Sequence, residues 1–274
     1  MKLNLQRSCA MTLVESMITL VLVGVLGLLV YSLLNLGTIL GAKNSAVNVA
    51  HQSARMAMLQ MTQDFHSAVS PFTLVDGNGN TVAGTGPAEG VAFHLWGKDT
   101  NGQELPPYKI KSDAAAGQNQ VHIIATSATK PAVGQWLIVP THEIEAQITA
   151  VSGTSDCTLT LANNIATAIE GTGDPGYYNI ASFITDRVSY TVVNGALQWS
   201  GPAYKKTFSS AILGQNITNS KPFTIPTSQS GAPLSDSVAA IDLSTADNTY
   251  SNRGFKAANI LLEGQVPSRA ILTQ

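Results

Sequence analysis

Glu15 is the ionisable residue whose position says most about this chain. No Asp, Glu, Lys, Arg or His occurs in the 27 residues from Ser16 to Ala42 that follow it. As a helix these residues would be about 40 Å long, at about 1.5 Å per residue, and the hydrocarbon core of a bilayer is about 30 Å thick. A carboxylate at the centre of such a span costs about 2.5–3.5 kcal/mol, and less near its edge. The pattern predicts a membrane-spanning helix with one acid at its start, and a partner for that acid.

Other residues that could hold a metal are not expected to converge. On a strand, the segment 142–145 (His-Glu-Ile-Glu) would turn His142 to one face and both glutamates to the other, so no metal site is predicted there. The segment 76–80 is similar to the start of a Ca²⁺ loop, but an EF-hand needs Gly at its sixth place and Glu at its twelfth. The chain has Thr81 and Pro87 at those places, so a turn is predicted.

Motifs for catalysis are also missing from the sequence. It contains no Gly-x-Ser-x-Gly, Walker A or Cys-x-x-Cys motif, and its five histidines are scattered. The segment 99–102 (Asp-Thr-Asn-Gly) is typical of a turn. The formal charge is −2, so there is no excess of base to neutralise phosphates. We predict no enzyme activity, no cofactor, no metal and no nucleic-acid partner.

The ten residues before the apolar run carry Lys2 and Arg7 and no acid. A secretory signal peptide has its apolar region before the cleavage site, whereas here that region follows the candidate site, Ala10-Met11. The segment from Cys9 to Glu15 (Cys-Ala-Met-Thr-Leu-Val-Glu) resembles the prepilin leader of type IV pilins and type II secretion pseudopilins. That leader has a small residue before the cut, an apolar first mature residue, and then Thr-Leu-x-Glu. Ala10 stands where the family usually has Gly, and Met11 where it usually has Phe.

The resemblance implies roles for three residues. A prepilin peptidase would cut after Ala10 and leave Met11 with a free, methylated amine, and Glu15 would pair with the amine of a neighbouring subunit. Two buried charges that meet offset much of each other's desolvation, whereas removing one leaves the other stranded. The alternative for Glu15 is an interfacial carboxylate that reaches back to water.

Cleavage would also change the charge and the cysteine content. Removal of residues 1–10 leaves 13 bases against 17 acids, a formal charge of −4. It removes Cys9, so Cys157 would stand alone and an internal disulfide is excluded. Since Lys2 and Arg7 precede the span, the positive-inside rule leaves the bulk of the chain outside the cytoplasm. The expected location is the bacterial inner membrane, single-pass with a periplasmic head, and then a pilus or pseudopilus.

A helical pattern continues beyond the span, with apolar residues at spacings of three and four. We therefore predict one helix from Leu13 to Val69, ended by Ser70-Pro71. The face expected to pack on a sheet consists of Ala54, Ala57, Met61 and Phe65. The whole chain is expected to be α+β, with a leader (1–10), a transmembrane half-helix (11–42), an amphipathic half-helix (43–69) and a β-rich head (70–274).

The head is predicted to contain an antiparallel sheet. Asn194-Gly195 between two apolar runs predicts a type I′ hairpin, which would pair Val192 with Leu197 and Tyr190 with Trp199. Strands 91–96, 238–243 and 258–262 are expected to belong to the same sheet. Short, evenly spaced strands predict a small β-barrel or sandwich inserted at about 111–180; they are 121–126, 135–139, 143–151 and 158–161.

The hairpin, the order of elements and the chain length resemble the larger minor pilins and minor pseudopilins, of the PilW and J types. This implies a structural subunit that assembles through its N-terminal helix with other pilins or pseudopilins, at the tip or in the initiating complex. Its other partners would be the prepilin peptidase and inner membrane lipid. A type IV pilus, a type II secretion system and a DNA-uptake system all remain open. The alternative is a membrane-anchored periplasmic binding or enzymatic β-domain whose leader resemblance is accidental.

Overall fold

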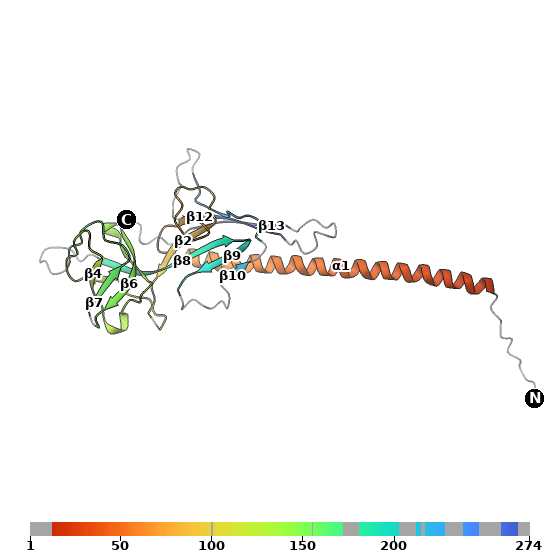
Figure 1. Ribbon diagram of the computed structural model, residues 1–274, viewed down its shortest axis with the longest axis horizontal. Coiled ribbons are helices and arrows are strands. Elements are labelled where there is room, and N and C mark those ends of the chain that lie inside the picture. The colour runs from red at the N-terminus through yellow and green to blue at the C-terminus, as the bar shows by residue number, and fades with distance from the viewer. Residues whose placement is uncertain are drawn as a thin grey trace, which may run out of the picture. The chain divides into compact units, whose positions relative to one another are not determined.

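The computed structural model describes residues 13–99, 101–154, 156–171, 181–202, 212–214, 217–227, 238–246 and 259–267. The chain divides into two compact units, residues 1–49 and 50–274, and each is described by itself. One long apolar N-terminal helix and a large antiparallel β-sheet make the fold α+β, as the sequence predicts (Figure 1).

The helix α1 (Leu13–His66) ends before the expected Val69. The amide of Ala68 donates to the Phe65 carbonyl at 3.0 Å, which tightens the last turn, and the amide of Val69 donates to the His94 carbonyl at 2.8 Å. Val69 thus begins the pairing of the chain with strand β2 (Gly90–Trp96). Pro71 has no amide hydrogen with which to continue a helix.

Ten strands form one antiparallel sheet in the order β1-β2-β8-β3-β4-β7-β6-β5, with β9 paired to β8 and β10 paired to β9. Besides β2, the strands are β1 (Thr73–Val75), β3 (Tyr108–Ile110), β4 (Gln120–Ile124), β5 (Trp136–Val139), β6 (Ile144–Ser152), β7 (Asp156–Leu161), β8 (Ala181–Val193), β9 (Ala196–Ser200) and β10 (Ile212–Gly214). Two 3₁₀ helices flank β5, η1 (Ser127–Thr129) and η2 (Pro140–His142).

The long strand β8 is shared between two parts of this sheet. From Thr185 to Thr191 it pairs with β2, and from Ser189 to Val193 it pairs with β9. Its first residues pair with β3 and β5 instead. Because β3, β4, β7, β6 and β5 also pair in that order, these strands and β8 form a closed ring. Figure 1 shows β4, β6 and β7 of this ring side by side, in green.

The predicted hairpin is confirmed, with its register. Val192 pairs with Leu197 and Tyr190 with Trp199 across β8 and β9. The turn residues Asn194 and Gly195 have φ angles of 51° and 73°. A type I′ turn requires positive φ at both positions, which Asn and Gly tolerate best.

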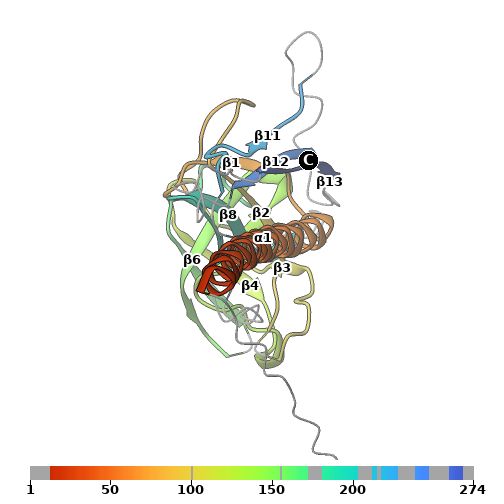
Figure 2. The same cartoon turned by 90° about the vertical axis from the view of Figure 1, so that its right-hand side faces the viewer.

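The last two strands do not belong to the large sheet, so that prediction was wrong. Strands β12 (Val238–Ala246) and β13 (Asn259–Pro267) pair with each other, and β12 pairs with β11 (Phe223–Thr224), in a separate three-stranded sheet. Figure 2 shows these three strands together, in blue. The apolar face of β12 lies in the same core as Phe65. An alternating pattern predicts that a face is buried, but not which edges pair. Strands β1, β3, β10 and β11 were not predicted, because two or three residues carry no periodicity.

The last turns of α1 pack on the face of the sheet that holds the β8–β9 hairpin. Ala57, Met61 and Phe65 are 1%, 0% and 0% exposed and belong to one core with Val192 and Leu197. This confirms the predicted helix face for these three residues; the side chain of the fourth, at position 54, is not among those described.

Phe65 is the centre of an aromatic cluster in this core. Its ring centroid lies 4.8 Å from that of Phe72, 5.1 Å from that of Phe93 and 5.9 Å from that of Tyr190. The last two contacts are edge-to-face, and such pairs contribute about 0.5–1.5 kcal/mol each beyond the area they bury.

A buried carboxylate lies beside the cluster. Asp64 is 2% exposed, and its Oδ2 accepts a hydrogen bond from the Tyr190 hydroxyl at 2.8 Å. Its Oδ1 accepts one from the Gln60 amide nitrogen Nε2 at 3.1 Å. Burial of the phenol, and then the neighbouring Asp64 charge, raise the pKa of Tyr190 far above its ordinary value, so the hydroxyl keeps its proton. A buried carboxylate is costly without such donors, so this contact specifies one position of the helix on the sheet.

The ring of strands surrounds a second hydrophobic core. Most of its members come from β3 to β8, and others come from the loops between them. They include Ile110, Ile123, Leu137, Ile148, Leu159 and Ile184, all at most 1% exposed. Four of its strands, β4 to β7, match the short strands predicted within 111–180.

The burial of Phe65 predicts a large loss of stability on its truncation. In the full chain in detergent micelles, Phe65→Ala should lower the free energy of unfolding by about 3–5 kcal/mol, which for a domain of this size lowers Tm by roughly 6–20 °C. Thermal unfolding followed by circular dichroism in the near ultraviolet measures the change. Leu59→Ala is the matched control, because Leu59 lies on the same helix and is 58% exposed. Equal effects from both variants would mean that the helix packs through another face.

Candidate functional site

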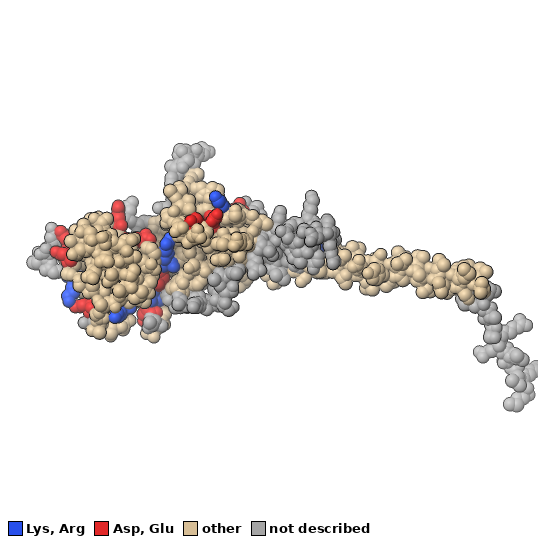
Figure 3. Space-filling model, viewed as in Figure 1, with Lys and Arg blue, Asp and Glu red and all other residues tan. Residues whose placement is uncertain are grey.

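The apolar part of α1 is the first candidate site. Its residues Leu13–Ser45 are long and apolar enough to cross a membrane, and the described part of the chain holds one such helix. Large apolar side chains along it are exposed, for example Leu20 at 76% and Leu28 at 69%. In Figure 3 the part of this segment that is not covered by grey atoms is tan, whereas blue and red atoms are spread over the head. The segment fits a single-pass membrane anchor.

Glu15 lies in the first turn of α1. Amide groups without a partner within the helix, and the helix dipole, favour a negative charge there. The Thr19 hydroxyl donates to the Glu15 carbonyl oxygen at 2.7 Å, which holds the backbone of this turn helical. The two predicted processing residues, Ala10 and Met11, lie outside the described residues. Of the predicted site residues, the structure therefore places Glu15.

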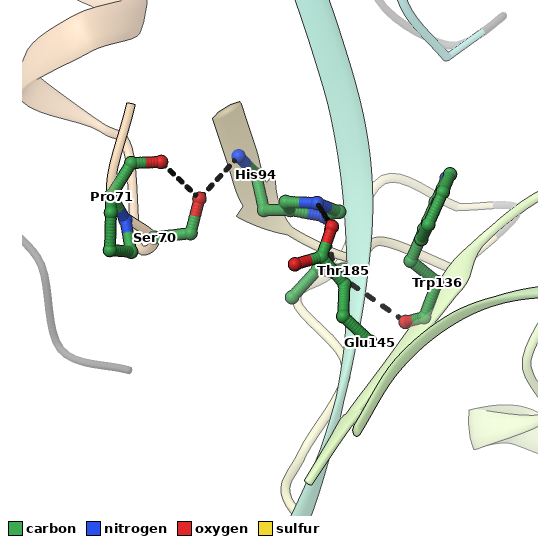
Figure 4. A network of polar contacts seen from close by, with 6 residues as sticks. All are labelled: Ser70, Pro71, His94, Trp136, Glu145 and Thr185. Carbon is green, nitrogen blue, oxygen red and sulfur yellow. Dashed lines mark hydrogen bonds and ion pairs between the residues drawn. The ribbon is translucent and has the colours of Figure 1, made fainter. Parts of the chain in front are cut away.

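A second candidate is a polar network around His94 in the head (Figure 4). The Nδ1 atom of His94 lies 2.9 Å from the Thr185 hydroxyl, and its Nε2 lies 2.9 Å from Oε1 of Glu145. The His94 amide also donates to the Ser70 hydroxyl oxygen at 2.9 Å, and Ser70 donates to the Pro71 carbonyl at 3.0 Å. The network joins the chain after α1 to β2, β8 and β6.

A hydroxyl, an imidazole and a carboxylate in contact are also found in catalytic triads, but here their burial indicates a structural role. Thr185 is 0% exposed, so its hydroxyl cannot reach a substrate, which a nucleophile must do. His94 is buried as well, with 4% of its side chain exposed, whereas Glu145 is 55% exposed. The hydrogen bond from His94, and more weakly the charge of Arg187, hold the pKa of Glu145 below its ordinary value of 4.5. The network ties β6 to β2 across β8.

The sequence did not predict this network, because its members are distant along the chain. Glu145 is 51 residues from His94, and Thr185 is 91 residues from it. The signal that could have found it is a histidine inside an apolar strand, since a buried imidazole needs partners for its nitrogens.

The two sequence patterns considered for metals are structural. The segment 142–145 is not one strand: η2 ends at His142, Glu143 has a φ of 52°, and β6 starts at Ile144. Among the described residues, no group of three or more His, Cys, Asp or Glu side chains is arranged to hold a metal. The turn at 76–80 is confirmed, because Oδ1 of Asp76 accepts hydrogen bonds from the Asn78 and Asn80 amides, at 2.9 and 2.8 Å.

The chain matches none of the protein-family models, curated proteins or solved structures compared with it. A fold does not by itself define a function, so the function has to be argued from the site. Two features carry that argument: an apolar helical segment with one carboxylate in its first turn, and a head whose core contains the last turns of α1.

The His94–Glu145 contact predicts a pH-dependent contribution to stability. Glu145→Gln should lower the free energy of unfolding at pH 7 by about 0.5–1 kcal/mol, a small value because Glu145 is exposed and screened. The folded-state pKa of Glu145 is lowered, so its contribution is complete above the ordinary value of 4.5 and is lost as pH falls through the folded-state pKa. The difference in stability between the unaltered chain and Glu145→Gln should therefore disappear at pH values below that folded-state pKa.

Denaturant unfolding of the full chain in micelles, followed by tryptophan fluorescence at a series of pH values, measures this difference. Glu143→Gln is the matched control, since Glu143 is exposed and two residues away. A Glu145→Gln effect that stays constant with pH would contradict the electrostatic origin.

Proposed function

We propose that the chain is a structural subunit of a type IV pilus or a type II secretion pseudopilus, of the minor kind found at the tip or in the initiating complex. The observation that carries the proposal is the apolar segment Leu13–Ser45 with Glu15 in the first turn of its helix. The prepilin-like order Ala10-Met11-Thr12-Leu13-Val14-Glu15 adds to it.

The physical basis is pairing of Glu15 with the free amine of Met11 in a neighbouring subunit. In an apolar surrounding each of these groups alone is costly. When they meet, each offsets much of the desolvation of the other, and the pair defines the axial register between subunits. The methylene and methyl groups of Leu, Val and Ile along the span supply the surface for packing between helices.

The glycines of the span support close approach of such helices. A Cβ built at Gly24, Gly27, Gly37 or Gly41 meets no atom of the described residues within 4 Å. These positions are therefore not explained by packing within the subunit. Small residues on membrane helices allow backbones of neighbouring helices to approach.

The last turns of the helix would be a fixed part of the head. Phe65 and Asp64, in the last turns of α1, are buried against Tyr190 of β8. We further propose that residues 111–180 are a small β-subdomain inserted into the head sheet, and that the head lies on the periplasmic side before assembly. The closed ring of strands with its own core supports the inserted subdomain, and Lys2 and Arg7 before the span support the orientation.

A membrane-anchored binding domain is the second candidate. A hollow of about 870 Å³ on the head, lined by residues of β8 and β9 among others, favours this candidate. The anchor would then serve only to hold that domain at the membrane. The two candidates differ at the N-terminus, because only a pilin-like subunit requires processing and assembly through Met11 and Glu15.

Processing is the first prediction of this proposal. A prepilin peptidase should cut between Ala10 and Met11, because that bond lies at the cytoplasmic edge of the span. Mass spectrometry of the membrane-extracted chain, produced with and without the peptidase, should find a chain that starts at N-methylated Met11 only when the peptidase is present. An intact Met1 in assembled filaments would contradict the pilin-like function and leave the anchored domain.

Assembly is the second prediction. Glu15→Ala should leave insertion into the membrane intact, since it removes a costly carboxylate, but it should reduce assembly because the amine of the neighbour loses its partner. Yield of sheared filaments and cysteine crosslinking between subunits measure assembly, and membrane fractionation measures insertion. Glu104→Ala, which removes an exposed carboxylate of the head, should change neither. Normal assembly of Glu15→Ala would refute the pairing.

A further inference from the structure

The head carries a polar hollow that neither the anchor nor assembly through the helix requires. Its volume is about 870 Å³, within the range of roughly 300–1,000 Å³ typical of ligand sites. Its lining comes from β8, β9, the segment 132–136 before and at the start of β5, Gln147 of β6, and the turns at 77–79 and 98–99. Segments far apart in the sequence thus surround one space.

The floor of the hollow is a patch of neutral hydrogen-bonding groups. It consists of Ser189 and Thr191 on β8 and of Gln198 and Ser200 on β9. The register pairs Ser189 with Ser200 and Thr191 with Gln198, so the four side chains lie together on one face. The alternating residues Tyr190, Val192 and Leu197 point into the core on the other face.

These four floor side chains make no hydrogen bond to any residue that the structure describes. Three hydroxyls and a carboxamide offer both donors and acceptors to whatever enters the hollow. Strand β8 lies between β2 and β9, and β9 is paired with β10 at Leu197 and Gln198. A peptide therefore could not add beside β8 as a further strand, which is the usual way in which a sheet binds one.

An aromatic ring and an arginine form one wall. The guanidinium carbon of Arg187 lies 5.3 Å from the ring centroid of Trp136. The ring of His94 is edge-on to that of Trp136, with ring centroids 5.4 Å apart (Figure 4). Stacking on the Trp136 ring holds the planar guanidinium of Arg187, with its five N–H donors, in place. The guanidinium of Arg187 makes no hydrogen bond to any side chain or backbone group that the structure describes, so its donors are left for a ligand.

The charged residues that line the hollow indicate that its ligand is neutral. The charged residues that line the hollow are two cations, Lys98 and Arg187, and two anions, Asp99 and Asp186. The Asp186 carboxylate is buried and accepts hydrogen bonds from the Lys98 amide at 3.2 Å and from Gln135 Nε2 at 3.3 Å. A polyanion such as nucleic acid needs an excess of base, which this lining does not offer.

From these groups we infer that the hollow is a binding site for a neutral saccharide. Sugar rings present hydroxyls that both donate and accept, which match the floor and the guanidinium of Arg187, and apolar C–H groups that suit the part of Trp136 that lines the hollow beside Arg187. The inference concerns residues of the head and does not depend on the proposed assembly through Glu15.

The test uses the full chain in detergent micelles and an immobilised panel of neutral oligosaccharides of glucose, galactose, mannose and N-acetylglucosamine, with heparin as the acidic comparison. At least one neutral oligosaccharide should bind, and titration calorimetry with that oligosaccharide in solution should give its Kd. Arg187→Ala and, separately, Gln198→Ala should each weaken binding about tenfold or more, because each removes hydrogen bonds to the ligand.

Arg55→Ala and Gln63→Ala are matched controls, since both side chains are exposed on α1, and they should leave the Kd unchanged. Melting temperatures of all variants identify any that does not fold, and Gln198→Ala decides the question if Arg187→Ala is such a variant. Binding to heparin alone, no binding to any neutral oligosaccharide, or equal weakening in the controls would overturn the assignment.

Discussion

The contact between the last turns of α1 and strand β8 is the interaction on which the described head depends. It has an apolar part, which stabilises the docked helix, and a polar part, which selects its position. The rings around Phe65 supply most of the burial, but apolar contacts alone tolerate sliding and rotation. The hydrogen bond from Tyr190 to Asp64 does not, because a displaced helix would leave a buried carboxylate without its donor. Burial therefore stabilises the docked helix, and the hydrogen bond selects its position.

Strand β8 extends the effect of this contact through the head. Its C-terminal half lies between β2 and β9 over the first core, and its N-terminal residues close the ring over the second core. The His94 network ties β2 to β6 across the same strand. The hollow opens on the face of β8 that neither core covers, so both the floor at Ser189 and Thr191 and the wall at Arg187 owe their positions to this one strand.

The apolar segment of α1 and the head differ in how strongly their surroundings screen a charge. In the proposed assembly, one carboxylate in the apolar segment of α1 would direct association, because few groups in a medium that solvates it poorly can compensate its charge. In the head, exposed charges are screened and contribute little, and recognition has to come from several neutral groups held at fixed positions. The proposed assembly through Glu15 and the proposed saccharide site at Arg187 follow these two regimes and share no residue.

Local patterns in the sequence determined the elements whose signals are local. The length of the apolar run, the helical spacing from Ala57 to Phe65 and the Asn194-Gly195 turn each depend on neighbours within a few residues, and the structure confirms them. Only the tertiary structure decided the pairing of β12 and β13 in a sheet of their own, the contact of His94 with Glu145, and the hollow beside Trp136. These depend on which edges and faces meet after the chain has closed long loops, and the identity of a residue carries no record of a partner 51 positions away.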